Sequence, residues 1–328
     1  QEYDDLVAEF VAAVQEAFPS ALLQWEDFSN KTSFDNLSTY REALPSFNDD
    51  IQGTAAMVVA GLMAATKHIG SKIADQRIVI VGAGSAGVGI RDQIATAMVD
   101  EGAGRAEAEA RIMTLDSRGL LAEGRPNLPL GKRRLAVSLE AVKDWQIDDH
   151  PIGLRDVVRN ARASVLIGVS GVPGVFTEEM IRRMALHAER PIIMPLSNPT
   201  SHAEVTPASA IEWSDGRAIV ATGSPFPDVQ HDGKRHCIGQ ANNVFVFPGM
   251  GLGVLTVGAR QVSDRMFLAA SKALAAAVGP ELVESGQLYP SMTDVRATSV
   301  AVAQAVAHQA VAEGLADPMP DINERIEE

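Results

Sequence analysis

Cysteine is almost missing from this chain of 328 residues, because Cys237 is the only one. A single cysteine excludes an intrachain disulfide framework and any cysteine-based zinc site. Long apolar runs are missing too: none reaches the roughly 18 to 20 residues that span a bilayer, and the first residues show no signal-peptide pattern. We therefore expect a cytoplasmic protein that does not have a membrane as its partner.

Positive charge is also scarce. The chain has 28 Lys and Arg against 42 Asp and Glu, which gives a net charge of −14, and its longest basic run is Lys132-Arg133-Arg134. Charge of this sign repels nucleic acid and anionic membrane surfaces, so we expect no nucleic-acid partner. With 46% hydrophobic and 21% charged residues, the chain is long enough for two domains with cores of their own.

The pattern of strands and helices indicates an α/β protein. Residues 21–25 are typical of a short strand, and the apolar stretch 54–68 is typical of a buried helix. Strands and helices then alternate along the chain. The predicted strands cover 77–81, 110–115, 164–169, 191–196 and 218–221, and the predicted helices cover 83–99, 139–142, 177–186 and 207–213. This alternation predicts a doubly wound parallel sheet covered on both faces.

The chain changes character after residue 244. The pattern there is mostly helical, with helices predicted over 252–262, 264–278 and 293–311. Residues 317–328 are polar, so we expect a mobile tail. At the other end, Gln1 is followed at once by an amphipathic helical pattern, which suggests that further sequence precedes it.

A glycine-rich loop follows the predicted strand 77–81. Gly82, Gly84 and Gly87 form a G-x-G-x-x-G pattern after a strand and at the start of a helix, which is the context that makes this pattern informative. The glycines permit a tight turn, a close approach to a pyrophosphate and close packing of helix on strand. The helix N-terminus, which includes Ser85 and Ala86, offers amides and positive potential to the phosphates. We therefore predict a dinucleotide site.

The next strand ends in Asp116, where a carboxylate can accept hydrogen bonds from ribose hydroxyls. The separation from the glycine loop is longer than the usual spacing of about 20 residues, and the polar segment 100–109 accounts for it. Ser117 follows, and Lys132 and Arg133 could reach a 2′-phosphate or form a solvated basic loop. The choice between NAD and NADP therefore stays open.

Two acidic strings precede the glycine loop: Trp25-Glu26-Asp27-Phe28, and Asn48-Asp49-Asp50-Ile51. Carboxylates among apolar residues are costly to bury unless a cation or hydrogen bonds compensate them. Glu26, Asp27 and Asp50 offer hard oxygen ligands, which suit Mg²⁺ or Mn²⁺. Neighbouring side chains of a strand point to opposite faces, so Glu26 and Asp27 can share an ion only if the chain bends after Trp25. The alternative is a set of solvated acids with a helix cap.

Two asparagines stand at predicted element boundaries, where a side chain can reach a ligand. Asn198 comes after the predicted strand 191–196, and Asn243 precedes the helical part. Side-chain amides at such places can hold a carboxylate or a carboxamide, although each residue alone is also common in turns and caps.

Together these strings resemble the malic enzyme family. The resemblance rests on Trp-Glu-Asp-Phe, Phe-Asn-Asp-Asp-Ile-Gln-Gly-Thr, Gly-Ala-Gly-Ser-Ala-Gly, Leu-Ser-Asn-Pro-Thr, Thr-Gly-Ser-Pro-Phe and Asn-Asn, in this order over nearly the whole chain. It implies oxidative decarboxylation of L-malate to pyruvate and CO₂ with NAD or NADP and Mg²⁺ or Mn²⁺.

The resemblance also implies roles for individual residues. Glu26, Asp27 and Asp50 would be metal ligands, and Asp49 would act as a catalytic residue in the proton network beside them. Asn198 and Asn243 would contact malate and the nicotinamide end of the cofactor. The residues implied at the rest of the cofactor are Gly82, Gly84, Ser85, Ala86, Gly87, Asp116, Ser117, Ser170 and Gly171.

In this family the cofactor domain interrupts the other domain. We therefore expect a Rossmann-like unit at 49–243, inserted into a second α/β domain with a helical C-terminal part, formed by 1–48 and 244–316. The catalytic tyrosine and lysine of the family belong to an N-terminal domain for which we find no counterpart, so we expect poor turnover of malate by this chain alone.

Other functions remain open. A malolactic-type enzyme would keep NAD bound and release lactate, and a non-catalytic dinucleotide-binding module would release neither product. The resemblance further implies a homo-dimer or homo-tetramer.

Overall fold

A seven-stranded sheet forms the centre of the protein. The computed structural model describes residues 2–128, 130–148 and 150–328. The strand order is β11-β8-β7-β6-β3-β4-β5, and every pair is parallel except β4 with β5. The strands of this sheet are β3 (Ile78–Val81), β4 (Ile112–Asp116), β5 (Gly119–Leu120), β6 (Val165–Gly168), β7 (Ile192–Pro195), β8 (Ile219–Thr222) and β11 (Gly239–Gln240). This sheet confirms the predicted α/β class.

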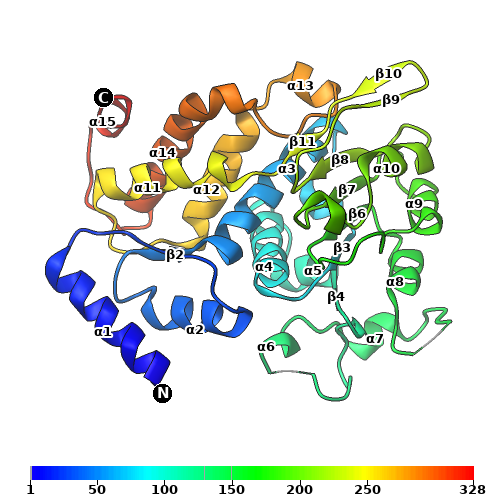
Figure 1. The fold of residues 1–328 in the computed structure, drawn as a ribbon, viewed down its shortest axis with the longest axis horizontal. Coiled ribbons are helices and arrows are strands. Elements are labelled where there is room, and N and C mark those ends of the chain that lie inside the picture. The colour runs from blue at the N-terminus through cyan, green and yellow to red at the C-terminus, as the bar shows by residue number, and fades with distance from the viewer. Residues whose placement is uncertain (1, 129, 149) are drawn as a thin grey trace.

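Two smaller pairs of strands lie outside this sheet. β1 (Leu23–Trp25) and β2 (Ser46–Asn48) pair in parallel, and β9 (Val229–His231) and β10 (Lys234–His236) form an antiparallel hairpin that projects from the upper right of the molecule in Figure 1. The first pair is the one that matters for the site.

Helices cover both faces of the sheet (Figure 1). The helices of the described chain are α1 (Glu2–Ala17), α2 (Asn30–Tyr40), α3 (Thr54–His68), α4 (Ser85–Asp100), α5 (Arg105–Ala110), α6 (Leu130–Arg133), α7 (Leu139–Val142), α8 (Leu154–Ala161), α9 (Glu178–Ala185), α10 (Pro207–Trp213), α11 (Phe247–Val257), α12 (Asp264–Ala276), α13 (Pro280–Glu284), α14 (Val295–Ala312) and α15 (Ile322–Glu327). No helix in the part of the chain that the structure describes is long and apolar enough to cross a membrane.

The central strands are apolar on both sides because both faces are covered. Ile78 and Ile80 of β3 belong to one hydrophobic core, with α3 and α4, whereas Val79 and Val81 belong to the core under α8, α9 and α10. Such a run of consecutive β-branched residues is typical of a strand buried on both faces. Successive side chains of β3 therefore point alternately into the two hydrophobic cores on either side of the sheet.

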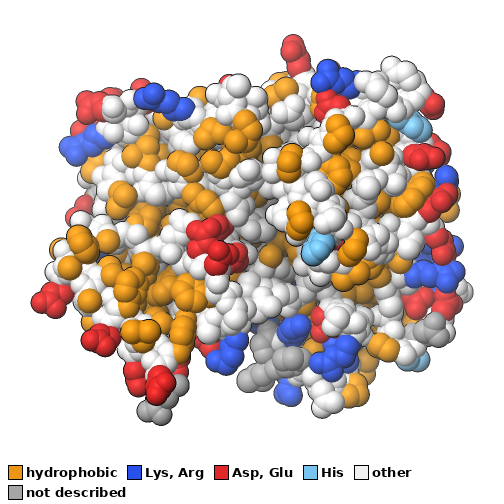
Figure 2. Space-filling view, viewed as in Figure 1, with side chains coloured by type: hydrophobic (Ala, Val, Ile, Leu, Met, Phe, Trp, Pro, Cys, Tyr) orange, Lys and Arg blue, Asp and Glu red, His pale blue; other side chains and the backbone are white. Residues whose placement is uncertain are grey.

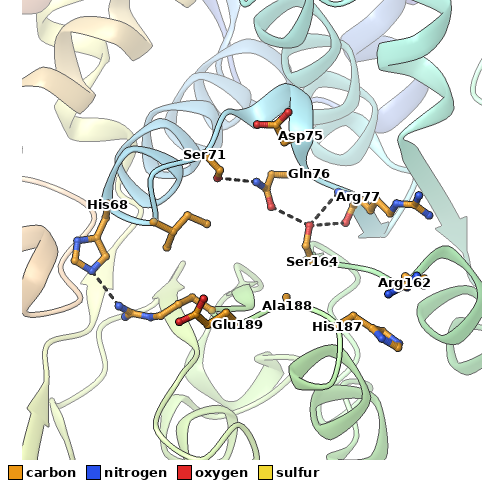
Figure 3. A pocket seen from close by; sticks show the side chains of 12 residues that line it. His68, Ser71, Asp75, Gln76, Arg77, Arg162, Ser164, His187, Ala188 and Glu189 are labelled. Carbon is orange, nitrogen blue, oxygen red and sulfur yellow. Dashed lines mark hydrogen bonds between the residues drawn. The ribbon is translucent and has the colours of Figure 1, made fainter.

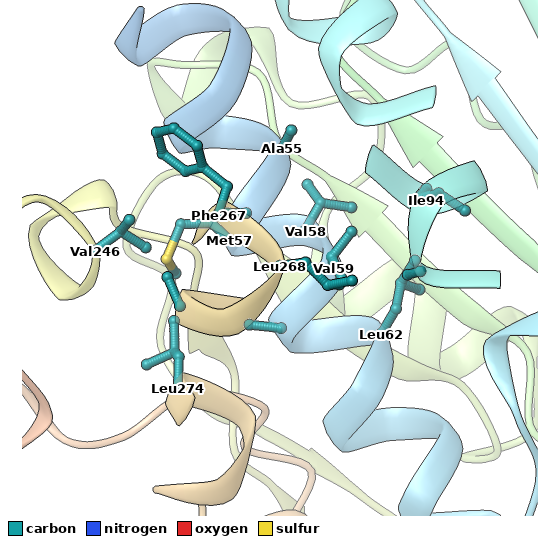
Figure 4. Close-up of a cluster of buried hydrophobic side chains, with 14 of the residues drawn as sticks. Ala55, Met57, Val58, Val59, Leu62, Ile94, Val246, Phe267, Leu268 and Leu274 are labelled. Atoms are coloured by element: carbon teal, nitrogen blue, oxygen red, sulfur yellow. The ribbon is translucent and has the colours of Figure 1, made fainter. Parts of the chain in front are cut away.

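Helix α3 connects the sheet to the helical C-terminal part. Eleven of its 15 residues are buried, and the helix packs on α4 on one side and on α12 on the other (Figure 4). One continuous core therefore runs from the sheet through α3 to α11, α12 and α14.

Two C-terminal expectations differ from the structure. The helix expected at 252–262 is α11, which begins at Phe247 and ends at Val257, because Gly258 adopts a left-handed conformation (φ 57°) that caps the helix. The segment 317–328, expected to be a mobile tail, contains α15, which buries Ile322 and Ile326 against the core. Two apolar residues four positions apart are enough to hold a short helix on that core.

The buried hydroxyl of Tyr289 provides a test of the junction between α3 and the C-terminal part. Tyr289 is 1% exposed and donates to the backbone oxygen of Met57 at 3.0 Å. We expect Tyr289→Phe to lower the free energy of unfolding by about 1 kcal/mol, the usual net value of one hydrogen bond. Urea denaturation measures this loss. Tyr40→Phe is the matched control, because Tyr40 stacks on Trp25 through its ring, and it should change stability little; equal effects of the two variants would contradict the assignment.

Candidate active site

The short parallel pair β1–β2 brings the two acidic strings together. Its register aligns Leu23 with Ser46 and Trp25 with Asn48. Both strands run in the same direction, so the residues that follow them leave the pair at the same end. Glu26 and Asp27 therefore emerge beside Asp49.

The chain bends after Trp25, as a shared cation requires. Asp27 has a positive φ of 60°, a conformation that Asp tolerates better than most residues. Its backbone amide donates to Oδ2 of Asp50 at 3.2 Å. The turn thus ties the first acidic string to the second.

A π-helical turn, η1 (Asp49–Gly53), carries the second string into α3. Asn48 caps the turn, since its Oδ1 accepts from the amide of Ile51 at 2.9 Å. Single π-turns at the start of a helix are frequent at functional sites. This turn places Asp49 and Asp50 at the entrance to a buried helix.

The carboxylates of the two strings repel one another. Burial, Glu26 and Asp50 raise the pKa of Asp49 to about 7, against the hydrogen bond that Asn243 Nδ2 donates to Asp49 Oδ1 at 2.6 Å. Burial raises the pKa of Asp50, and Asp27 and Glu26 add to the effect, while the amide of Asp27 opposes it. Mutual repulsion of this kind is what a bound cation relieves.

A group of acidic side chains stands out in Figure 2, near the middle of the face shown and bordered by apolar side chains. Within the described ranges, no three His, Cys, Asp or Glu residues are positioned as a ready-made metal-ligand set. Gln24 Nε2 holds Glu26 Oε2 at 2.8 Å. The donor chemistry fits a hard cation, and metal binding by Glu26, Asp27 and Asp50 stays a prediction.

The glycine loop has the backbone shape that its sequence predicts. Gly82 has φ 122°, and a Cβ there would lie 2.4 Å from the backbone oxygen of Val169. A Cβ on Gly87 would lie 1.9 Å from the backbone oxygen of Gly82, so α4 meets the loop without room for a side chain. Close approach of this kind leaves the amide end of α4 open to phosphate.

Sequence reasoning missed Asn30 at this loop. Its Oδ1 accepts from the backbone amide and from the hydroxyl of Ser85, both at 2.8 Å. Asn30 begins α2, just after the first acidic string, so one short segment touches both the acidic group and the amide end of α4. An asparagine close behind an acidic string was the available signal, but nothing in the sequence indicates that it reaches residue 85.

Asp116 ends β4, and its carboxylate is held in place. Arg125 Nη2 donates to both oxygens at 2.7 Å, and Lys132 Nζ lies 3.4 Å from Oδ2. Burial acts to raise the pKa of Asp116, but the hydrogen bonds from Arg125 and from the amide of Arg118 lower it, so the group stays charged. Ser117 is exposed beside it. The contact of Asp116 with a ribose stays a prediction.

Glu204 organises two strand ends and was also missed. It is 0% exposed, and no cation pairs with it within the described ranges. Its Oε1 accepts from the amide and the hydroxyl of Ser170 at 2.9 Å and from the hydroxyl of Ser197 at 2.5 Å. The Ser197 hydroxyl accepts in turn from the amide of Gly171 at 2.9 Å. Hydrogen bonds thus satisfy a buried carboxylate that would otherwise be costly.

Asn198 and Asn243 line one cavity, of about 400 Å³, although 45 positions separate them. Asn198 Oδ1 accepts from Ser224 Oγ at 2.6 Å, and Asn243 Nδ2 reaches Asp49. The cavity therefore connects the ends of β7 and β8 with the acidic strings, and it places amide groups where a carboxylate could bind.

The tyrosines lie elsewhere. The hydroxyl of Tyr289 is buried against Met57, Tyr40 stacks on Trp25, and Tyr3 accepts from Asn36 Nδ2 at 2.9 Å. Neither a tyrosine nor a lysine is among the described residues that line the cavity.

Comparison with known proteins decides the family. Residues 51–311 match the family model described as "Malic enzyme, NAD binding domain", and residues 1–41 match "Malic enzyme, N-terminal domain". The chain belongs to the malic enzyme family. The second match corrects one expectation, because a portion of the N-terminal domain does have a counterpart here, in the first 41 residues. This segment carries Glu26, Asp27 and Asn30.

Curated relatives and solved structures agree. The chain is 49% identical to "NAD-dependent malic enzyme" of Sodalis glossinidius over 96% of its own length and 56% of the relative's, and 45% identical to that of Vibrio campbellii over 100% and 58%. The crystal structure of Entamoeba histolytica malic enzyme superposes with a TM-score of 0.75 at 30% identity, covering 98% of this chain and 60% of that one. The malic enzyme from Pyrococcus horikoshii gives 0.73 at 29%, covering 98% and 68%. The chain thus spans little more than half the length of these curated relatives.

Glu204 provides a test of the strand-end arrangement. In Glu204→Gln, an amide donor replaces one carboxylate oxygen and faces the donors of Ser170 and Ser197. We expect the free energy of unfolding to fall by about 1 to 3 kcal/mol, the cost of a buried donor without a partner, and NAD binding to weaken on the order of tenfold. Chemical denaturation and a fluorescence titration with NAD measure the two effects. Glu212→Gln, on the exposed side of α10, is the matched control, and unchanged NAD affinity in Glu204→Gln would contradict the proposed link to the strand ends.

Proposed function

We propose that this malic enzyme chain takes part in the NAD-dependent oxidative decarboxylation of L-malate to pyruvate and CO₂, with Mg²⁺ or Mn²⁺. The observation that carries the proposal is the junction of three features. The acidic strings meet at the end of the β1–β2 pair, Asn243 links Asp49 to the amide-lined cavity, and Asn30 links the same region to the glycine loop.

A divalent cation held by Glu26, Asp27 and Asp50 would supply Lewis acidity toward the hydroxyl and keto oxygens of the substrate. Asp49 lies beside that group and accepts from Asn243 Nδ2 at 2.6 Å, so it is placed to take part in proton transfer at the substrate. Asn198 offers an amide donor to a malate carboxylate. Asn243 would contact the substrate from the same cavity, with its Nδ2 donating to Asp49 and Thr54. Leu196 and Met57 give the cavity part of its apolar lining.

The glycine loop and the strand ends would hold the cofactor. Gly82, Gly84 and Gly87 leave room for a pyrophosphate at the amides of Ser85 and Ala86, and a phosphate there would take the place of Asn30 Oδ1 at the Ser85 amide. Ser170 and Gly171 occupy the end of β6, on the path from the loop to the cavity. The family model supports NAD in this place.

We propose NAD rather than NADP. The carboxylate of Asp116 is fixed by Arg125 at the end of the second strand of the nucleotide unit. This carboxylate can accept from ribose hydroxyls, but Lys132 Nζ also lies 3.4 Å from its Oδ2, so the charge at this position does not decide between the two cofactors. The names of the relatives, which specify NAD, therefore carry the choice.

Separate losses of metal and cofactor test the assignment of the two sites. We expect Asp50→Asn to weaken Mn²⁺ binding on the order of tenfold or more, because one anionic oxygen ligand is removed, and to leave NAD binding unchanged. Isothermal titration calorimetry measures both. Asp35→Asn is the matched control, since Asp35 is exposed and pairs with Lys31. Normal Mn²⁺ affinity in Asp50→Asn would exclude Asp50 as a ligand.

Gly87→Ala should show the opposite pattern. The added methyl group would lie 1.9 Å from the backbone oxygen of Gly82 and would push α4 away from the loop. We expect NAD binding to be lost, with Mn²⁺ binding retained. Gly104→Ala is the control, because a Cβ there meets nothing within 4 Å. If Gly87→Ala binds NAD as well as the unmodified chain, the glycine loop is not the cofactor site.

Product analysis tests the reaction. With L-malate, Mn²⁺ and NAD, pyruvate and NADH in equal amounts support the proposal, whereas lactate without net reduction indicates the malolactic-type reaction. We expect slow turnover by this chain alone, because its described cavity lacks the tyrosine and lysine that would move protons. A rate typical of a complete malic enzyme would contradict that expectation, and NAD binding without any product would favour a dinucleotide-binding module.

We also propose that the protein forms a homo-dimer or homo-tetramer. Light scattering measures the molar mass in solution and distinguishes these states from a monomer.

A further inference from the structure

A second cavity, of about 530 Å³, lies at the amino ends of β3, β6 and β7. Gln76 and Arg77 precede β3, Ser164 precedes β6, and Ala188 to Arg190 precede β7. The glycine loop follows β3, so this cavity is at the opposite end of the sheet from the nucleotide site. Figure 3 shows its two walls, one from the end of α3 and the chain leading to β3, and the other from the segment between α9 and β7.

Basic side chains dominate the lining of this cavity. Arg77, Arg162 and Arg190 contribute to it, together with His68 and His187. Two carboxylates also line it. Asp75 Oδ2 accepts from the amide of Lys72 at 3.0 Å as a helix cap, and Glu189 is exposed. In a chain with a net charge of −14, a cavity with more cations than anions is unusual and attracts anions.

Arg190 holds one end of the cavity. Its Nε donates to the backbone oxygen of Arg217 at 3.1 Å, and its Nη1 lies 3.0 Å from Nε2 of His68. The guanidinium is half-buried, and no carboxylate within 4.0 Å pairs with it in the described ranges. Two neutral partners thus orient a guanidinium that feels the charge of Glu189 but forms no ion pair with it in the described ranges. A guanidinium can bind an oxyanion through two parallel hydrogen bonds.

Arg162 and His187 form the other end, on the opposite side of the cavity in Figure 3. Burial lowers the pKa of His187, and Arg162 and Arg183 lower it further. At the first end, burial and then Arg190 lower the pKa of His68, with Glu284 opposing and Lys234 adding to the effect. Burial is thus the main cause of both shifts, and a neighbouring arginine adds to each.

Hydrogen bonds hold the wall between the two ends. Ser164 Oγ accepts from the amide of Arg77 at 3.0 Å and donates to Gln76 Oε1 at 2.9 Å, and Gln76 Nε2 donates to Ser71 Oγ at 2.9 Å. This network orders the wall that lies between the basic ends, so this part of the cavity is formed before a ligand binds.

We propose that this cavity binds a small molecule with two separated anionic groups, phosphate or carboxylate, one at Arg190 and His68 and the other at Arg162 and His187. The volume is within the range of small-molecule sites, about 300 to 1,000 Å³. The distance of the cavity from the glycine loop makes the ligand distinct from the dinucleotide.

Calorimetric titration of the whole chain tests the proposal, with inorganic pyrophosphate and glutarate as probes at constant ionic strength. We expect saturable binding of at least one probe, and the probe that binds tells phosphate from dicarboxylate chemistry. Arg190→Gln and Arg162→Asn should each weaken it about tenfold, the effect of losing one charge-assisted hydrogen bond. Asn is chosen at position 162 because the residue has a positive φ of 51°, which Asn tolerates.

Arg260→Gln is the charge-matched control, since Arg260 pairs with Asp317 on the helical part of the molecule. No saturable binding of either probe would overturn the proposal. If Arg190→Gln or Arg162→Asn leaves the affinity for the probe unchanged, the proposal of a site with two basic ends is wrong. Should a variant fail to fold, the proton resonances of His68 and His187 in the unmodified chain provide the second readout: both should shift on addition of the probe, and a probe that shifts neither contradicts the proposal.

Discussion

The parallel pairing of β1 with β2 is the contact on which the candidate active site depends. Each strand has only three residues, yet their register sets where the two acidic strings leave the pair. Four carboxylates then come together, of which Glu26 and Asp27 are exposed, Asp50 is half-buried and Asp49 is buried. Burial together with repulsion by the neighbouring acids raises the pKa of Asp49 and Asp50. Folding has to overcome this repulsion, so the apolar residues beside the acids, Trp25 and Phe47, matter as much as the acids themselves.

The same N-terminal segment is coupled to the nucleotide loop and to the C-terminal helices. Asn30 reaches Ser85 at the start of α4, and Phe47 packs on Phe247 and Phe267. Residues far apart in the chain thus share one core that includes α3. A change at either end of the chain is expected to reach the site through packing, because interiors of this density deform little.

Hydrogen bonds to Glu204 hold the residues that follow β6 and β7 in place. Parallel strands leave their terminal amides without partners where the chain turns toward a ligand. A buried carboxylate without a cation can accept several of those amides and hydroxyls at once, and it does so for Ser170 and Ser197. The arrangement keeps two loops in fixed relation without a metal or a salt bridge.

Much of the fold could be predicted from local pattern. The strands and helices predicted between 77 and 222 agree closely with those observed, because apolar runs between turn residues specify buried strands without help from the rest of the chain. The short elements α5, β5, α6 and α8 were not predicted. The ends of α11 and the packing of α15 could not be predicted. The first depends on the conformation of Gly258, and the second on a core surface that α11 and α14 create.

The glycine loop and the chemical types of the acidic residues were determined by the sequence alone, since both depend on residues adjacent in the chain. Tertiary structure alone decided what meets them. It brought Glu26 to Asp49 through a strand pair, Asn243 to Asp49 across 194 positions, and Asn30 to the loop across 55. Such long-range contacts depend on how separate elements pack into one core, and the spacing of residues along the chain does not specify that packing.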